Sequence, residues 1–159
     1  MKNSDNLIFT RDYLGIKLWD IRGTTNAPVT NYAVCDYIEK NLCNLYEEDS
    51  IYDKFFMDVS PCQNYLITGN YNKSAHILDV AGSHNVTVTT NFDMKRGKVS
   101  AKTRKYNEKK KLAPLDTAPI DFKKKVLVGH WSPIENLVAI AFRNCIFLYQ
   151  EKGMVPSTR

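Results

Sequence analysis

Several features that define other protein classes are missing from this chain of 159 residues. No apolar run approaches the ~20 residues that span a bilayer, so we do not expect a membrane protein. The opening stretch MKNSDNLIFT has one Lys and a short apolar run without a cleavage-like site, so we expect no signal peptide. The cysteines are scattered without a C-x-x-C pair, which predicts reduced thiols in a cytoplasmic protein, with the nucleus as an alternative. They are Cys35, Cys43, Cys62 and Cys145.

The sequence also lacks the motifs of common enzymes. It contains no G-x-S-x-G and no H-E-x-x-H, and GNYNKS at 69–74 lacks the spacing and second Gly of a phosphate-binding loop. The three His fall in separate parts of the chain without the spacing of metal ligands. They are His76, His84 and His130. We therefore expect no enzyme activity, no catalytic residue, no metal and no cofactor.

What is present is an ordinary globular composition, with 43% hydrophobic and 25% charged residues, but its charge is segregated. Residues 95–111 hold nine Lys or Arg against one Glu, and residues 36–58 hold seven Asp or Glu against two Lys. We interpret the basic run as a solvated loop; attraction of phosphates or of a nuclear import receptor is the alternative. Its single aromatic residue, Tyr106, gives no sign of specific nucleic-acid recognition.

Three strand–turn–strand units organise the chain, at 7–21, 65–80 and 137–150. The first aligns with the second without a gap, and both end on an apolar residue followed by Asp. The runs FFMDVSPCQN and VLVGHWSPIEN precede the second and third units, and each closes with Ser-Pro, two residues and Asn, which is turn chemistry. Short strands at this frequency predict an all-β repeat protein.

The units are about 59 and 72 residues apart, which exceeds the ~40–45 residues of a WD repeat. Two insertions explain the surplus. Apolar residues at helical spacing within 35–50 predict a short amphipathic helix, and residues 91–121 predict a long basic loop. Without these insertions, each unit is about four short strands, the size of a propeller blade.

We therefore predict a partial WD-repeat β-propeller of about ten strands in two and a half blades, with a sandwich or meander as the alternative. Trp19 and Asp20 occupy the position of the WD dipeptide, where Trp19 would fill a core between blades and Asp20 would cap the next turn. The predicted division is a blade part at 6–34, the helix at 35–50, a full blade at 51–90, the loop at 91–121, and a last blade without its fourth strand at 122–150. Open blade flanks also predict that the isolated chain self-associates.

Three blocks of sequence carry a more specific resemblance: TRDYLGIKLWD, YIEKNLCNLYEEDSIYDKF and HWSPIEN. In this order they resemble the C-terminal part of the fifty-five-kilodalton B-family regulatory subunits of protein phosphatase 2A, from about Asn6 to Gln150. The resemblance breaks down in the basic insertion and the last nine residues. It implies a closed propeller in the family and a non-catalytic subunit that binds the phosphatase scaffold and catalytic subunits and selects phosphoserine or phosphothreonine substrates. It implies neither a membrane nor a specific nucleic acid as a partner.

The resemblance also implies a binding site. An aromatic residue and a Lys that follow the inserted helix contribute to the family's substrate groove, and Tyr52 and Lys54 match them, with Tyr in place of the usual Phe. The neighbouring acidic face, Glu47, Glu48 and Asp49, would attract basic substrate segments. Without the resemblance, the residues themselves favour an ordinary exposed Lys at the start of a strand for Lys54. An unrelated WD-repeat interaction scaffold is the alternative function, and a truncated gene product that assembles with nothing is a third possibility.

Overall fold

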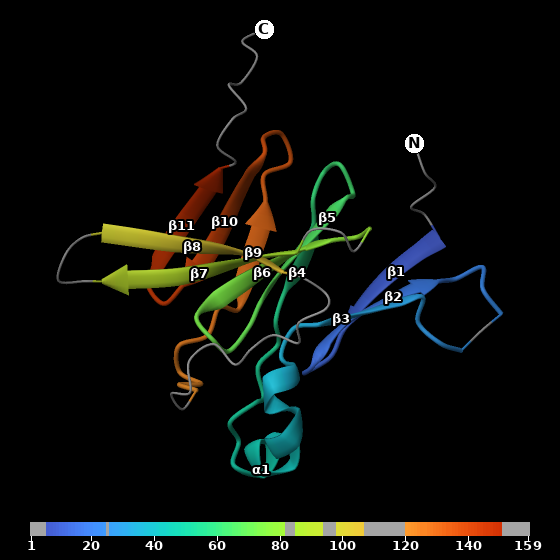
Figure 1. The fold of residues 1–159 in the computed structure, drawn as a ribbon, viewed down its shortest axis with the longest axis horizontal. Coiled ribbons are helices and arrows are strands. Elements are labelled where there is room, and N and C mark those ends of the chain that lie inside the picture. Colours follow the sequence, from blue (N-terminus) through green and yellow to red (C-terminus); the bar gives the residue numbers. More distant parts are fainter. Residues whose placement is uncertain (1–5, 25, 82–84, 94–97, 107–119, 151–159) are drawn as a thin grey trace, which may run out of the picture.

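The computed structural model describes residues 6–24, 26–81, 85–93, 98–106 and 120–150, and within them the chain forms three antiparallel sheets (Figure 1). The first sheet has the order β1-β2-β3, from β1 (Leu7–Arg11), β2 (Gly15–Asp20) and β3 (Thr30–Ala33). The second has the order β4-β5-β6-β7-β8, from β4 (Met57–Val59), β5 (Tyr65–Gly69), β6 (Ser74–Asp79), β7 (Asn85–Asp93) and β8 (Lys98–Tyr106). The third has the order β11-β10-β9, from β9 (Val128–Trp131), β10 (Leu137–Phe142) and β11 (Cys145–Gln150).

The three predicted strand–turn–strand units are the hairpins β1–β2, β5–β6 and β10–β11. Both Ser-Pro stretches form the predicted turns. Ser60 Oγ accepts a bond from the backbone N–H of Tyr65, and Ser132 Oγ accepts one from the backbone N–H of Glu135. The prediction of an all-β, partial WD-repeat propeller is confirmed in this arrangement of small antiparallel sheets.

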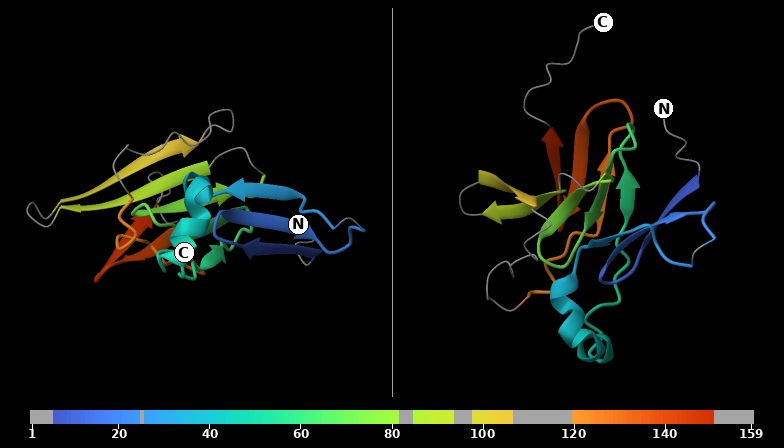
Figure 2. Two further views of the ribbon diagram at one scale, coloured as in Figure 1. Left: turned by 90° about the horizontal axis from the view of Figure 1, so that it is seen from below. Right: turned by 45° about the vertical axis from the view of Figure 1, so that its right-hand side comes forward.

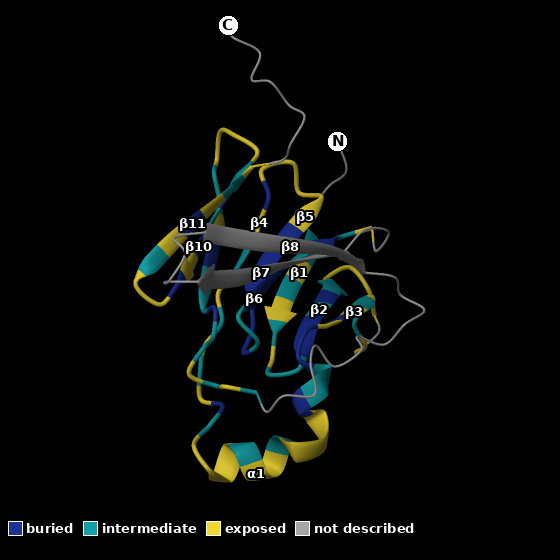
Figure 3. Ribbon diagram, turned by 60° about the vertical axis from the view of Figure 1, so that its left-hand side comes forward, coloured by how far each residue is buried: buried dark blue, intermediate teal, exposed yellow. Residues whose placement is uncertain are grey.

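The middle sheet is held between two hydrophobic cores because successive residues of a strand face opposite sides. In the first core, Leu66 of β5 packs with Ile16 and Leu18 of the first sheet. In the second core, the next residue, Ile67, packs with Val138 and Ile140 of the third sheet. Figure 3 shows that burial is greatest at the centres of the sheets and that the helical insert is more exposed. The sheets therefore stack in chain order, as neighbouring propeller blades do.

Close approach of the backbone fixes the spacing of the second and third sheets. A Cβ atom on Gly69 would lie 1.9 Å from the carbonyl oxygen of Val126. Gly69 ends β5, and the backbone N–H of Val126 bonds to the carbonyl of the following residue, Asn70, at 2.9 Å. Only glycine fits at this contact, which brings the chain into position to begin β9.

The predicted helix at 35–50 is present as two short turns that project from the sheets (Figure 2). A 3₁₀ helix, η2 (Asp36–Asn41), is followed by the α-helix α1 (Leu42–Glu47). Ile38 of η2 is fully buried in the first core, while α1 has no buried residue. The insert is thus anchored at its start and open to solvent at its end.

The middle sheet differs from the prediction of four strands, because the described residues form a fifth, β8. β7 and β8 pair from Asn85↔Tyr106 to Asp93↔Lys98, so nine residues of the expected basic loop form a strand. Charged residues, Lys above all, are well tolerated on an edge strand, which explains why a basic run takes this place. The described residues thus form eleven strands rather than the predicted ten. Residues 94–97 and 107–119 of the predicted loop lie outside the described residues.

The two residues of the Trp19-Asp20 pair have different surroundings. Asp20 accepts bonds at 3.0 Å from both the backbone N–H and the Nε of Arg22, which agrees with the predicted turn cap. Trp19 is half-buried on the face opposite Leu18, and its Nε1 donates to Thr10 Oγ1 at 2.8 Å. It joins neither of the two cores formed by the described residues, so its place in a core between blades stays a prediction.

The flanks of the stack carry exposed apolar side chains. On β11, Ile146 is 73% and Leu148 is 65% exposed, and on β1, Ile8 is 48% exposed. We predict that the isolated chain self-associates through these faces.

Candidate functional site

The segment between the helical insert and β4 turns every second side chain outward. Tyr52, Lys54 and Phe56 are exposed, while Asp53 and Phe55 between them are partly buried. We call Tyr52, Lys54 and Phe56 the outward row. Alternation of this kind presents a line of side chains on one surface, as a strand does.

Backbone bonds hold the outward row to the second and third sheets. The backbone N–H of Phe56 donates to the carbonyl of Leu127 at 3.0 Å, and the Phe56 carbonyl accepts from Thr68 Oγ1 at 3.1 Å. Asp53 forms an ion pair with Lys125, which precedes β9. The row is thus fixed by contacts with residues far away in the sequence.

A partly buried arginine, Arg11, supports the row from the first sheet. The Arg11 guanidinium lies 4.6 Å from the centroid of the Phe55 ring, and Nη1 donates to Thr68 Oγ1 at 2.7 Å. Burial lowers the pKa of Arg11. Tyr71 meets the same Phe55 ring edge-on at 4.8 Å between centroids. Phe55 therefore contacts both a cation and an aromatic ring, which fixes the backbone between Lys54 and Phe56.

At the other end of the row, two tyrosines from the insert and the row lie together. The ring centroids of Tyr46 and Tyr52 are 5.0 Å apart, with the planes tilted by 38°. A side-chain hydrogen bond with Tyr46 raises the pKa of Tyr52 to about 12, and the Asp49 carboxylate adds to this shift. The Tyr52 hydroxyl is thus joined to the insert through Tyr46.

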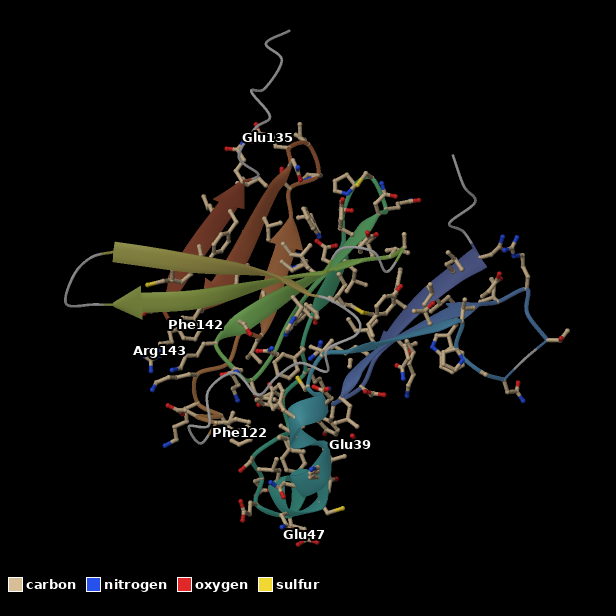
Figure 4. All side chains as sticks on the ribbon, viewed as in Figure 1. Glu39, Glu47, Phe122, Glu135, Phe142 and Arg143 are labelled. Carbon is tan, nitrogen blue, oxygen red and sulfur yellow. The ribbon has the colours of Figure 1, made fainter. Side chains whose placement is uncertain are left out.

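The acidic face lies at the end of α1. Glu47, Glu48 and Asp49 are all exposed, and Asp49 adopts a left-handed backbone conformation with φ of 56°. Glu47 lies at the end of the insert that points away from the sheets (Figure 4). The structure therefore brings Asp49 to the tyrosine pair, whereas Glu47 lies at the tip.

Sequence reasoning missed two exposed aromatic residues of this region, Tyr46 and Phe56. Tyr46 fitted the apolar spacing of the predicted helix, yet it is 49% exposed. Phe56 followed the matched family motif and was read as part of an apolar strand, yet it is 56% exposed. Alternation of side chains from Tyr52 onward is the signal that could have identified Phe56.

No protein-family model matches the sequence, whereas curated proteins are similar to it. The chain is 35% identical over 154 residues to the protein phosphatase PP2A 55 kDa regulatory subunit of Drosophila melanogaster. The chain is similar to part of that regulatory subunit. The match covers 96% of the chain, so the resemblance predicted from its sequence blocks is confirmed. The chain spans 31% of the length of this relative.

The described residues offer little for other kinds of site. No helix among them is long and apolar enough to cross a membrane. Within the same residues, no three His, Cys, Asp or Glu side chains gather as metal ligands would. His76 is buried beside Asn70, and burial lowers its pKa to about 4, which suits a neutral packed histidine. His84 lies outside the described residues.

Proposed function

We propose that the chain belongs to a non-catalytic regulatory subunit of protein phosphatase 2A, which binds the scaffold and catalytic subunits and recruits phosphoserine and phosphothreonine proteins. The observation that carries this proposal is the 35% identity to a PP2A regulatory subunit along 96% of the chain. We propose the cytoplasm as its location, with the nucleus as a second one.

The outward row supports substrate recruitment. It combines an aromatic ring, a cation and a second aromatic ring on a backbone that is fixed before any ligand arrives. Aromatic anchors with few rotatable bonds are typical of energetically important binding positions. We propose that Tyr52 contacts an apolar part of the substrate and that Lys54 contacts one of its acidic groups.

The acidic face supports the same proposal. Carboxylates near the C-terminal end of a helix are disfavoured by the partial negative charge of the terminal carbonyls. Stability therefore does not explain why Glu47, Glu48 and Asp49 gather at the end of α1. An acidic surface beside a binding row attracts basic segments and directs their approach.

Isolation of the chain from cells tests the assignment. We expect the phosphatase scaffold and catalytic subunits to co-purify with it. Their absence, with other proteins bound instead, would favour an unrelated WD-repeat interaction scaffold.

A further inference from the structure

Phe56 is the member of the outward row that neither the sequence motif nor the hydrophobic cores account for. Its neighbours Phe55 and Met57 pack against the first core, but Phe56 belongs to neither core cluster of the described residues and is 56% exposed. Both backbone polar groups of Phe56 are bonded, to Leu127 and to Thr68. The ring is therefore exposed on a fixed backbone.

A second ring lies beside it. His130 of β9 has its ring centroid 6.4 Å from that of Phe56, with the planes tilted by 52°. Asp58, two residues after Phe56 and so on the same side of the chain, lies 3.2 Å from His130 Nδ1 through its Oδ2. The same oxygen accepts the backbone N–H of Trp131 at 2.9 Å. The Asp58 carboxylate therefore sets the position of the His130 imidazole. The carboxylate is itself held by the backbone N–H of Trp131.

We propose that Phe56 and His130 form an apolar subsite that lengthens the outward row and selects an apolar side chain in an extended substrate segment. The inference rests on the proposed substrate-binding role of Tyr52 and Lys54. Two rings from different sheets present a wall that is already in place, so binding loses little conformational entropy. An exposed aromatic pair of this kind gains from covering by an aliphatic or aromatic group.

The order of side chains along the row defines the occupant. Lys54 favours an acidic residue, and the Phe56–His130 pair lies two residues further along. Alternate residues of an extended chain are ~6.6 Å apart, so the matching segment carries its apolar residue two positions from the acidic one. At the opposite end of the row, Asp49 of the acidic face lies beside Tyr52. The acidic face favours basic residues in the part of the peptide that binds there. The predicted occupant is therefore an extended peptide that is basic, then acidic, then apolar.

Binding of two labelled synthetic peptides to the 159-residue chain tests this subsite by fluorescence anisotropy. Both carry Arg residues followed by a Glu, and two positions after the Glu one peptide has Leu and the other Ser. We expect the Leu peptide to bind about tenfold more tightly than the Ser peptide. Phe56→Ser should remove this preference, and His130→Ala should reduce it.

Two controls separate the subsite from general effects. Ile134→Ser changes another exposed apolar residue, at 90% exposure in the β9–β10 turn, and should leave the preference intact. Lys54→Glu should weaken both peptides alike. Equal binding of the two peptides by the unchanged chain, or a preference that survives Phe56→Ser, would overturn the subsite. Failure of both peptides to bind would also overturn it, while co-purification of the phosphatase subunits would still decide the proposed function.

Discussion

The guanidinium of Arg11 lies over the ring of Phe55, 4.6 Å from its centroid, although the two residues belong to different parts of the stack. Arg11 ends β1 in the first sheet, and Phe55 precedes β4 in the second. The contact joins the first sheet to the backbone that carries Lys54 and Phe56. The outward row is therefore supported on one side by Arg11 of the first sheet and on the other by Leu127, which precedes β9 of the third sheet.

Replacement of Arg11 tests this support. Arg11→Lys keeps the charge but loses the planar stacking on Phe55 and the fork of donors that reaches Thr68. We expect the free energy of unfolding to fall by about 1–3 kcal/mol. Thermal melts followed by Trp fluorescence at one protein concentration would measure the change. Lys17→Arg on β2 is the matched control, and an equal melting temperature for all three proteins would show that the Arg11 contact contributes nothing.

Charge reversal at Lys54 tests the binding row. Lys54→Glu should weaken dephosphorylation of a phosphoserine substrate by the assembled phosphatase at least tenfold, because an acidic substrate group would then meet a like charge. Binding of the scaffold subunit should stay unchanged. Arg143→Glu in the β10–β11 turn makes the same reversal elsewhere and should have no effect on either measurement. If Lys54→Glu lowers scaffold binding as much as dephosphorylation, Lys54 has a structural or assembly role instead.

The two faces of β2 give a stability prediction. Leu18 is 5% exposed in the first core, so Leu18→Ala should cost about 2–5 kcal/mol. A Trp19 side chain buried between blades would give Trp19→Ala a cost of similar size. Because Trp19 is half-buried outside the described cores, we expect a smaller cost for it. Urea unfolding of the two variants compares them directly. A larger loss for Trp19→Ala would mean that another surface covers its face of β2.

Burial of His76 predicts a dependence of stability on pH. Its pKa is lowered to about 4 in the folded chain, below the value of ~6.5 for an exposed histidine. The unfolded chain thus binds more protons between these values, so the free energy of unfolding should fall as pH decreases from about 6.5 to 4. Urea unfolding at several pH values would measure the slope, and His76→Gln should make it shallower. An unchanged slope in His76→Gln would contradict the assignment of this dependence to His76.

Much of the fold could be predicted because it depends on local sequence patterns. The hairpins β1–β2, β5–β6 and β10–β11 follow from short apolar strands separated by turn residues, and the insert follows from helical spacing. Strand β8 could not be predicted in this way, since a Lys-rich edge strand has the composition of a solvated loop. The side of β2 on which Trp19 lies depends on how the sheets stack, which its own neighbours in the sequence do not specify.

The candidate site was predictable only in part. The resemblance to the family suggested Tyr52 and Lys54, whose binding role stays a prediction. The contacts of Tyr46 with Tyr52 and of Arg11 with Phe55 depend on where the insert and the first sheet are placed. His130 and Asp58 are separated by 72 residues along the chain and meet only because β4 and β9 pack together. Such pairs arise from tertiary packing, and no local spacing indicates them.

Affinity isolation of the tagged chain from cells, with phosphatase scaffold and catalytic subunits measured by mass spectrometry, tests the central claim most directly. We predict that both subunits are enriched over an untagged control and that Lys54→Glu retains them. Isolation of the intact, folded chain with neither subunit enriched would contradict its assignment as part of a phosphatase regulatory subunit.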